Sequence, residues 1–67
     1  MPYPKNVPDG VFVEDLQDAI YNGGVLIGAI AAEFNIKESE IELWLSGQNL
    51  PSDETKFSIL TWLEEEA

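Results

Sequence analysis

The chain has 67 residues, with 13 Asp plus Glu against three Lys, no Arg and no His, and a formal charge of −10 at pH 7. This length allows one small domain, and the charge opposes association with nucleic-acid backbones, whose non-specific affinity comes mainly from cationic side chains. The absence of Cys excludes a disulfide framework and a thiolate metal site, and 45% hydrophobic residues is too many for a simple acidic disordered tail.

The first eight residues contain prolines at positions 2, 4 and 8. Proline lacks an amide donor and disfavours helix at the preceding residue, so residues 1–8 are predicted to form an extended arm. We expect a leader packed loosely through Tyr3, with a partner-binding strand as the alternative. The N-terminal segment lacks the layout of a secretory signal, and the longest apolar stretch is far short of the roughly 20 residues that span a bilayer. A cytoplasmic protein is therefore the expectation.

Residues 9–67 are predicted to fold as one all-α domain of four helices joined by short loops. Asp9 is expected to be the N-cap of a first helix over residues 10–21, where apolar side chains recur at helical spacing: Phe12, Leu16 and Ile20. Glycine reaches the left-handed conformation easily, so Asn22-Gly23-Gly24 predicts the turn that ends this helix. A second helix is expected over residues 25–34, and its inward side chains are Ile30, Ala31 and Phe34.

A tight turn is predicted at Asn35-Ile36-Lys37, because Asn tolerates positive φ better than most residues. A third helix should cover residues 38–46, with Glu38 and Glu40 in the first turn, where carboxylates interact favourably with the helix dipole. Lys37 is a poor N-cap because its side chain has no acceptor. The inward stripe of the third helix is Ile41, Trp44 and Leu45.

A loop is predicted at residues 47–51, and Ser52 followed by two acidic residues predicts the start of a last helix over residues 53–65. The expected core face of this helix is Phe57, Leu60 and Leu63. Ile59 and Trp62 would then be partly exposed, and aromatic side chains of that kind are enriched at interfaces. We therefore expect a homodimer through the last helix, formed by Ile59, Trp62 and Leu63.

Residues 27–51, IGAIAAEFNIKESEIELWLSGQNLP, have the apolar spacing of two helices that cross at a turn. A small residue, Ala31, stands where the helices must approach closely, and Asn35 stands at the turn. Apolar residues follow at Ile36, Ile41 and Trp44, and the second helix is followed by Gly47 and Pro51. This joint spacing resembles the Cro/repressor (lambda-repressor-like) helix-turn-helix family, and the resemblance implies a compact helical domain built around that motif.

The resemblance also implies which positions would face DNA, and here they are unusual. The family has a polar residue, often Gln, at the start of the first motif helix, where this chain has Ile27. The remaining positions are Lys37, Glu38, Ser39, Glu42, Leu43 and Ser46. Roughly six phosphate contacts would need more cations than three lysines provide. The face offers carboxylates beside an apolar side chain, which suits a protein partner better.

Enzymatic chemistry has little support, because the chain lacks the commonest general base, thiol nucleophile and phosphate clamp: His, Cys and Arg. No calcium-binding loop of the EF-hand type is present in the sequence. We expect no cofactor and no metal, and we interpret the acidic end of the last helix, Glu64-Glu65-Glu66, as solvated charge.

The sequence therefore predicts a small acidic regulator, built on a helix-turn-helix-like scaffold, that binds a protein partner with a basic surface. Such a protein would act as an inhibitor or DNA mimic of a nucleic-acid-binding protein, offering carboxylates where phosphates would lie. Its expected partner-binding residues are Lys37, Glu38, Ser39, Glu42, Leu43 and Ser46. The alternatives are a DNA-binding transcriptional regulator of the Cro/repressor type and a dimerisation or structural module. The size and the resemblance suggest a phage or mobile-element product.

Overall fold

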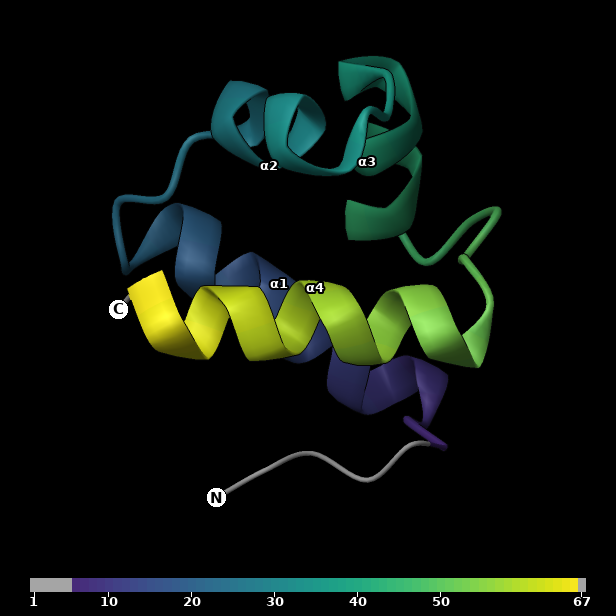
Figure 1. Cartoon of the computed structure of the whole chain (residues 1–67). Coiled ribbons are helices and arrows are strands. Elements are labelled where there is room, and N and C mark those ends of the chain that lie inside the picture. The colour runs from purple at the N-terminus through teal and green to yellow at the C-terminus, as the bar shows by residue number, and fades with distance from the viewer. Residues whose placement is uncertain (1–5, 67) are drawn as a thin grey trace.

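The computed structural model describes residues 6–66, so Tyr3 and most of the predicted arm lie outside the described residues. The described part is all-helical, as predicted, with its helices in the order α1 (Asp9–Tyr21), α2 (Ile27–Phe34), α3 (Glu38–Leu45) and α4 (Asp53–Glu66). The long helices α1 and α4 pack against each other, and α2 and α3 lie above them in Figure 1. Within residues 6–66 the longest helix, α4, has 14 residues, and no helix is both long and apolar enough to cross a membrane.

The start of α1 differs from the prediction. Asp9 is the first residue of the helix and not its N-cap; Pro8 is at the cap position, and no side chain caps the helix. The Asp9 carboxylate instead accepts a hydrogen bond from Lys56 Nζ at 2.6 Å. Both partners of this hydrogen bond are charged, and it uses the Asp9 carboxylate in a contact with α4 and not in a cap.

The start of α2 also differs from the prediction, by two residues. Gly24 has a φ of 75°, which directs the chain away from α1, and the Val25 amide donates to the Ala19 carbonyl at 3.1 Å. Val25 is therefore held against α1 in a non-helical segment. The helix begins only after Leu26, which is at the N-cap position in extended backbone.

Two locally determined features are confirmed. Asn35 follows α2 in the left-handed conformation, with φ 54° and ψ 50°, and the Ile36 amide donates to the Ala31 carbonyl at 2.9 Å. Ser52 precedes α4, and its Oγ accepts a hydrogen bond from the Thr55 amide at 3.4 Å. Both features satisfy backbone groups that a helix end leaves without an intrahelical partner.

A single core contains side chains from all four helices and from the segment before α1. Its members are Val7, Phe12, Leu16, Ile30, Ala31, Ile41, Trp44, Ile59, Leu60 and Leu63. The Phe12 and Trp44 rings meet edge to face, with centroids 5.8 Å apart. This pair joins α1 to α3, and aromatic pairs of this geometry stabilise beyond the area they bury.

The predicted exposure of α4 is wrong in part. Ile59 is fully buried and Phe57 is only partly buried, whereas Leu60 and Leu63 are buried as predicted, with Leu63 6% exposed. The structure packs α4 against α1 on one side, and on another side Trp62 meets Phe34 of α2 edge to face at 5.9 Å. A helix with neighbours on two sides buries a wide sector of its surface. Ile59 and Leu63 therefore belong to the monomer core and are not available for the expected dimer interface.

Candidate functional site

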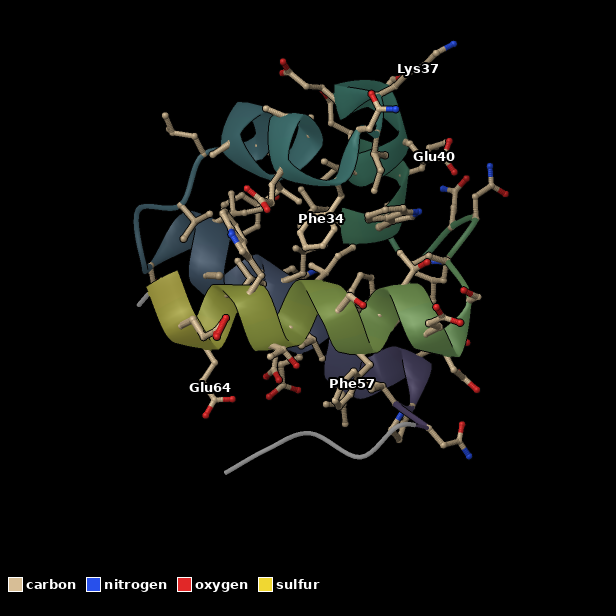
Figure 2. All side chains as sticks on the ribbon, viewed as in Figure 1. Phe34, Lys37, Glu40, Phe57 and Glu64 are labelled. Carbon is tan, nitrogen blue, oxygen red and sulfur yellow. The ribbon has the colours of Figure 1, made fainter. Side chains whose placement is uncertain are left out.

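The predicted partner-binding residues lie on α3 and at its two ends, and we call this set the α3 face: Lys37, Glu38, Ser39, Glu42, Leu43 and Ser46. All of these except Leu43 are exposed, and Leu43 is half-buried. Lys37 projects away from the molecule (Figure 2). Glu38 and Glu42 are separated by one helical turn, a spacing that places both carboxylates on one side of α3. The α3 face thus combines negative charge with one partly accessible apolar side chain.

The Glu38 carboxylate lies across the start of α2. A Cβ built on Gly28 would be 3.6 Å from Glu38 Oε2, and no side chain caps α2 at Leu26. The free amides at a helix N-terminus attract anions, and the helix dipole adds to this attraction. A carboxylate already lies at this end of α2, so an approaching phosphate would be repelled.

Ser46 is used inside the molecule. Its Oγ donates to the Leu43 carbonyl at 2.8 Å, and the Gln48 amide donates to the same carbonyl at 2.9 Å. The neighbouring Leu45 carbonyl accepts a hydrogen bond from Gln17 Nε2 of α1 at 2.8 Å. These contacts satisfy the last carbonyls of α3 and fix the end of the α3 face relative to α1. The Ser46 hydroxyl therefore already donates its proton within the molecule, to the Leu43 carbonyl at the end of α3.

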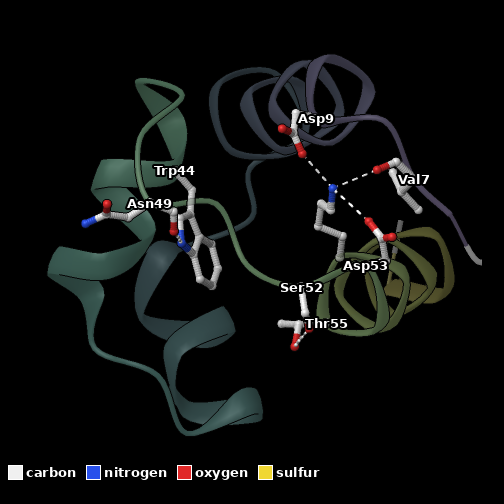
Figure 3. Close-up of polar contacts among 8 residues, drawn as sticks. Val7, Asp9, Trp44, Asn49, Ser52, Asp53 and Thr55 are labelled. Atoms are coloured by element: carbon white, nitrogen blue, oxygen red, sulfur yellow. Dashed lines mark hydrogen bonds and ion pairs between the residues drawn. The ribbon is translucent and has the colours of Figure 1, made fainter.

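Lys56 is a buried cation that the sequence analysis missed as a structural residue. Its Nζ donates to the Val7 carbonyl at 2.7 Å and to Asp9 Oδ1 at 2.6 Å, and it lies 3.1 Å from Asp53 Oδ1 (Figure 3). The Lys56 side chain is 5% exposed, whereas those of Asp9 and Asp53 are 68% and 55% exposed. The hydrogen bond to Asp9 raises the pKa of Lys56 above its ordinary value of 10.5, burial opposes this increase, and the hydrogen bond to Asp53 adds to it. The i,i+3 spacing of Asp53 and Lys56 was a visible signal, but it did not indicate burial.

Trp44 fixes the loop between α3 and α4. Its indole Nε1 donates to the Asn49 carbonyl at 2.8 Å (Figure 3), and its side chain is buried in the core, as predicted. Asn49 has a φ of 50° and Gly47 a φ of 82°, so the loop turns sharply twice within three residues. The indole hydrogen bond holds this turn against the core and sets where α4 begins relative to α3.

An open groove lies between α3 and α4, with a volume of about 420 Å³, and we call it the α3–α4 groove. It is lined by Phe34, Ile36, Glu40, Trp44, Glu54, Thr55 and Ser58. Its carboxylates come from different helices that are far apart in sequence. The sequence analysis placed Glu40 and Glu54 only as favourable first-turn residues and did not bring them together.

Among the described residues, no group of three or more His, Cys, Asp and Glu side chains is placed to hold a metal ion. Comparison of the chain with protein-family models, with curated proteins and with solved structures found no match.

Proposed function

We propose that this chain is a non-catalytic regulatory protein that binds a basic surface of another protein through the α3 face. The observation that supports this proposal is the distribution of charge on the molecule. Glu38 and Glu42 are exposed on one side of α3, while Lys56 is withdrawn into the interior and paired with two carboxylates. Of the two lysines in the described part of the chain, Lys37 alone presents its charge to solvent.

The proposed scaffold is helix-turn-helix-like. Support comes from the packing of α2 against α3, from the left-handed Asn35 between them, and from the burial of Ala31 in the core. Ile41 and Trp44 are buried on the inner side of α3. This arrangement leaves the opposite side of α3 free to contact a partner, which is the use that the resemblance to the Cro/repressor family implies for the second motif helix.

The proposed partner is a nucleic-acid-binding protein whose own basic surface the chain would occupy. A charge of −10 on 67 residues creates a strong negative field that attracts such a surface from a distance. The same field repels DNA, because DNA is a polyanion. Binding to DNA requires cations at the interface that displace counterions. The α3 face contributes one cation, Lys37, and that does not suffice to anchor a phosphate backbone.

A DNA-binding transcriptional regulator is the second candidate, and the α2–α3 arrangement is the observation that favours it. A mobility-shift experiment with random duplex DNA at low salt separates the candidates. We expect no shift, because the carboxylate of Glu38 lies at the end of α2 that would have to approach phosphate. A clear shift would replace the proposed function with the second candidate.

A dimerisation module would need an interface other than the buried Ile59 and Leu63.

The α3 face is tested by capture of proteins from a lysate of the native cells on the immobilised chain. Replacement of Glu38 and Glu42 by Lys should abolish capture of the specific partner. The matched control is Glu14→Lys with Asp18→Lys, which makes the same charge change on exposed residues one turn apart on α1. The control should retain most of the capture. Equal losses in both double variants would mean that total charge, and not the α3 face, determines binding.

A further inference from the structure

The α3–α4 groove has features that the α3 face lacks. It is lined by the apolar and aromatic side chains of Phe34, Ile36 and Trp44, of which Trp44 is only 3% exposed, and by the carboxylates of Glu40 and Glu54. We call the apolar side chains its floor and the carboxylates its rim. Phe34 projects from α2 toward α4, and Glu40 lies on α3 (Figure 2). The volume of about 420 Å³ falls within the range of about 300–1,000 Å³ that is typical of small ligand sites.

The floor of the groove is held rigidly. Phe34 packs edge to face on Trp62, with centroids 5.9 Å apart. Trp44 is fixed by the hydrogen bond of its indole to Asn49 and by the Phe12 ring at 5.8 Å. A preformed apolar surface binds with less loss of conformational entropy than one that must be ordered on contact.

The carboxylates of the groove have no cation among the described residues. Glu40 is half-buried and Glu54 is exposed, and neither is ion-paired within the part of the chain that the structure describes. Lys56 follows Glu54 by two residues, but its ammonium group is bound to Val7, Asp9 and Asp53. The groove therefore combines two uncompensated negative charges with an apolar floor.

Two other hollows fit a cationic side chain less well. The hollow of about 210 Å³ between α1 and α4 is lined by three carboxylates, Asp15, Asp18 and Glu64, but it has half the volume and none of its described lining residues is aromatic. The Asp18 carboxylate also accepts a hydrogen bond from Asn22 Nδ2 at 3.0 Å. The hollow at the start of α2 offers one carboxylate, Glu38, which lies against Gly28.

We propose that the α3–α4 groove binds an arginine side chain presented by the partner protein, an inference that rests on the proposed function for the basic character of that partner. The aliphatic stem of arginine covers the apolar floor, and its guanidinium group reaches the carboxylates at the rim. A planar guanidinium also stacks favourably on aromatic rings, which lysine does less well. The Ser58 hydroxyl lies in the same lining and offers a further acceptor.

The experiment titrates the ¹⁵N-labelled full chain with acetyl-Leu-Arg-Leu-amide and follows amide shifts by NMR. The control peptide contains citrulline, which has nearly the shape of arginine but no charge. We expect weak, saturable binding of the arginine peptide, with shifts concentrated at Ile36, Glu40 and Glu54–Ser58. The citrulline peptide should cause little shift at the same concentration. Equal binding of both peptides, or shifts centred on Asp15 and Asp18, would overturn the proposal.

Charge-neutral variants locate the contact. Glu40→Gln and Glu54→Gln should each lower the affinity for the arginine peptide by about two- to fivefold, the range measured for exposed ion pairs. The matched control is Glu14→Gln, which removes the same charge from an exposed position on α1 that lies outside both the groove lining and the α3 face. The affinity of this control for the arginine peptide should be unchanged, and the amide spectrum of each variant verifies the fold. An equal loss of affinity in Glu40→Gln and Glu14→Gln would contradict the groove as the site.

The two proposals fail in different ways. If the peptide does not bind the groove but Glu38→Lys with Glu42→Lys still abolishes partner capture, the arginine site is wrong and the α3 face stands. If the peptide binds the groove but capture is unaffected by changes on the α3 face, the groove stands and the proposed role of the α3 face is wrong.

Discussion

The ammonium group of Lys56 lies in the interior with an acceptor for each of its three protons, one of them a backbone carbonyl. Burial of a charge is costly unless it is paired and hydrogen-bonded. Here the cost is limited, because Asp9 and Asp53 stay exposed and only the cation loses its water. The contact joins residues 47 positions apart and ties the start of α1 to the start of α4. Lys56 therefore acts as a structural link between the helices and does not contribute to the surface charge.

Replacement of Lys56 by Met keeps most of the buried aliphatic volume and removes the charge. Val7 is buried, so its carbonyl would lose its donor, and we expect the free energy of unfolding to fall by about 1–3 kcal/mol. Urea denaturation followed by circular dichroism measures the loss. Lys37→Met, the same change at an exposed position, should stay within about 0.5 kcal/mol of the parent. Similar effects at both positions would show that the buried contact contributes nothing specific.

The parent and the Lys56→Met variant also differ in how their stability depends on pH. The pKa of Lys56 is raised in the fold, first by the hydrogen bond to Asp9, so the charged form stabilises the folded state. This contribution is complete below the unfolded value of about 10.5 and is lost as pH rises through the folded pKa. The difference in unfolding free energy between parent and Lys56→Met should therefore begin to shrink as pH reaches about 10.5 and shrink further above it. A difference that stays constant as pH rises through and above this value would contradict the assigned role of the charge.

At the scale of the element, the link between α2 and α3 depends on the backbone conformation of one residue. Asn35 has a φ of 54°, a region that costs most side chains roughly 1–2 kcal/mol. Asn35→Ala should destabilise by about 1 kcal/mol and lower the melting temperature by about 4–8 °C. Asn35→Gly should be close to neutral, since glycine adopts this conformation without steric strain. Thermal melts of the two variants give the comparison.

An exposed position inside α2 gives the opposite expectation for glycine. Ala32→Gly should destabilise by about 1 kcal/mol, because glycine is a poor former of helix interiors. Glycine would thus be tolerated at position 35 and costly three residues earlier. If Asn35→Gly lowered the stability as much as Ala32→Gly, the assignment of Asn35 to the left-handed conformation would be wrong.

The features predicted correctly are those that neighbouring residues determine. The turn at Asn35 and the cap at Ser52 depend on local backbone and side-chain chemistry, and both are present. The orientation of α4 could not be predicted, because its apolar residues surround the helix and its neighbours decide which are buried. Ile59 is buried for this reason. The meeting of Glu40 and Glu54 depends on how α3 crosses α4, which no spacing along the chain encodes.

At the scale of the molecule, the net charge acts over the whole structure. The described fold measures 25 × 25 × 20 Å, and the Debye length is about 30 Å at 0.01 M ionic strength and about 10 Å at 0.1 M. At low salt every exposed carboxylate therefore repels the others across the fold. Compact states of strongly charged proteins are destabilised by such repulsion, because unfolding separates the charges. The ion pairs of Lys56 oppose this effect locally, and their buried cation is screened less by salt.

Salt should consequently stabilise the fold. We expect the free energy of unfolding to rise by about 1 kcal/mol between about 0.01 M and about 0.3 M NaCl, measured by urea denaturation at pH 7. The variant with Glu38→Lys and Glu42→Lys carries a formal charge of −6, since each substitution adds two positive charges to the −10 of the parent. Its stability should rise less with salt. A fall in the stability of the parent would mean that local ion pairs outweigh the general repulsion, and an equal rise in both proteins would assign the effect to salt exclusion from the surface. A smaller rise in the variant would tie the salt response to the same surplus of carboxylates that, on the proposed function, attracts the basic partner.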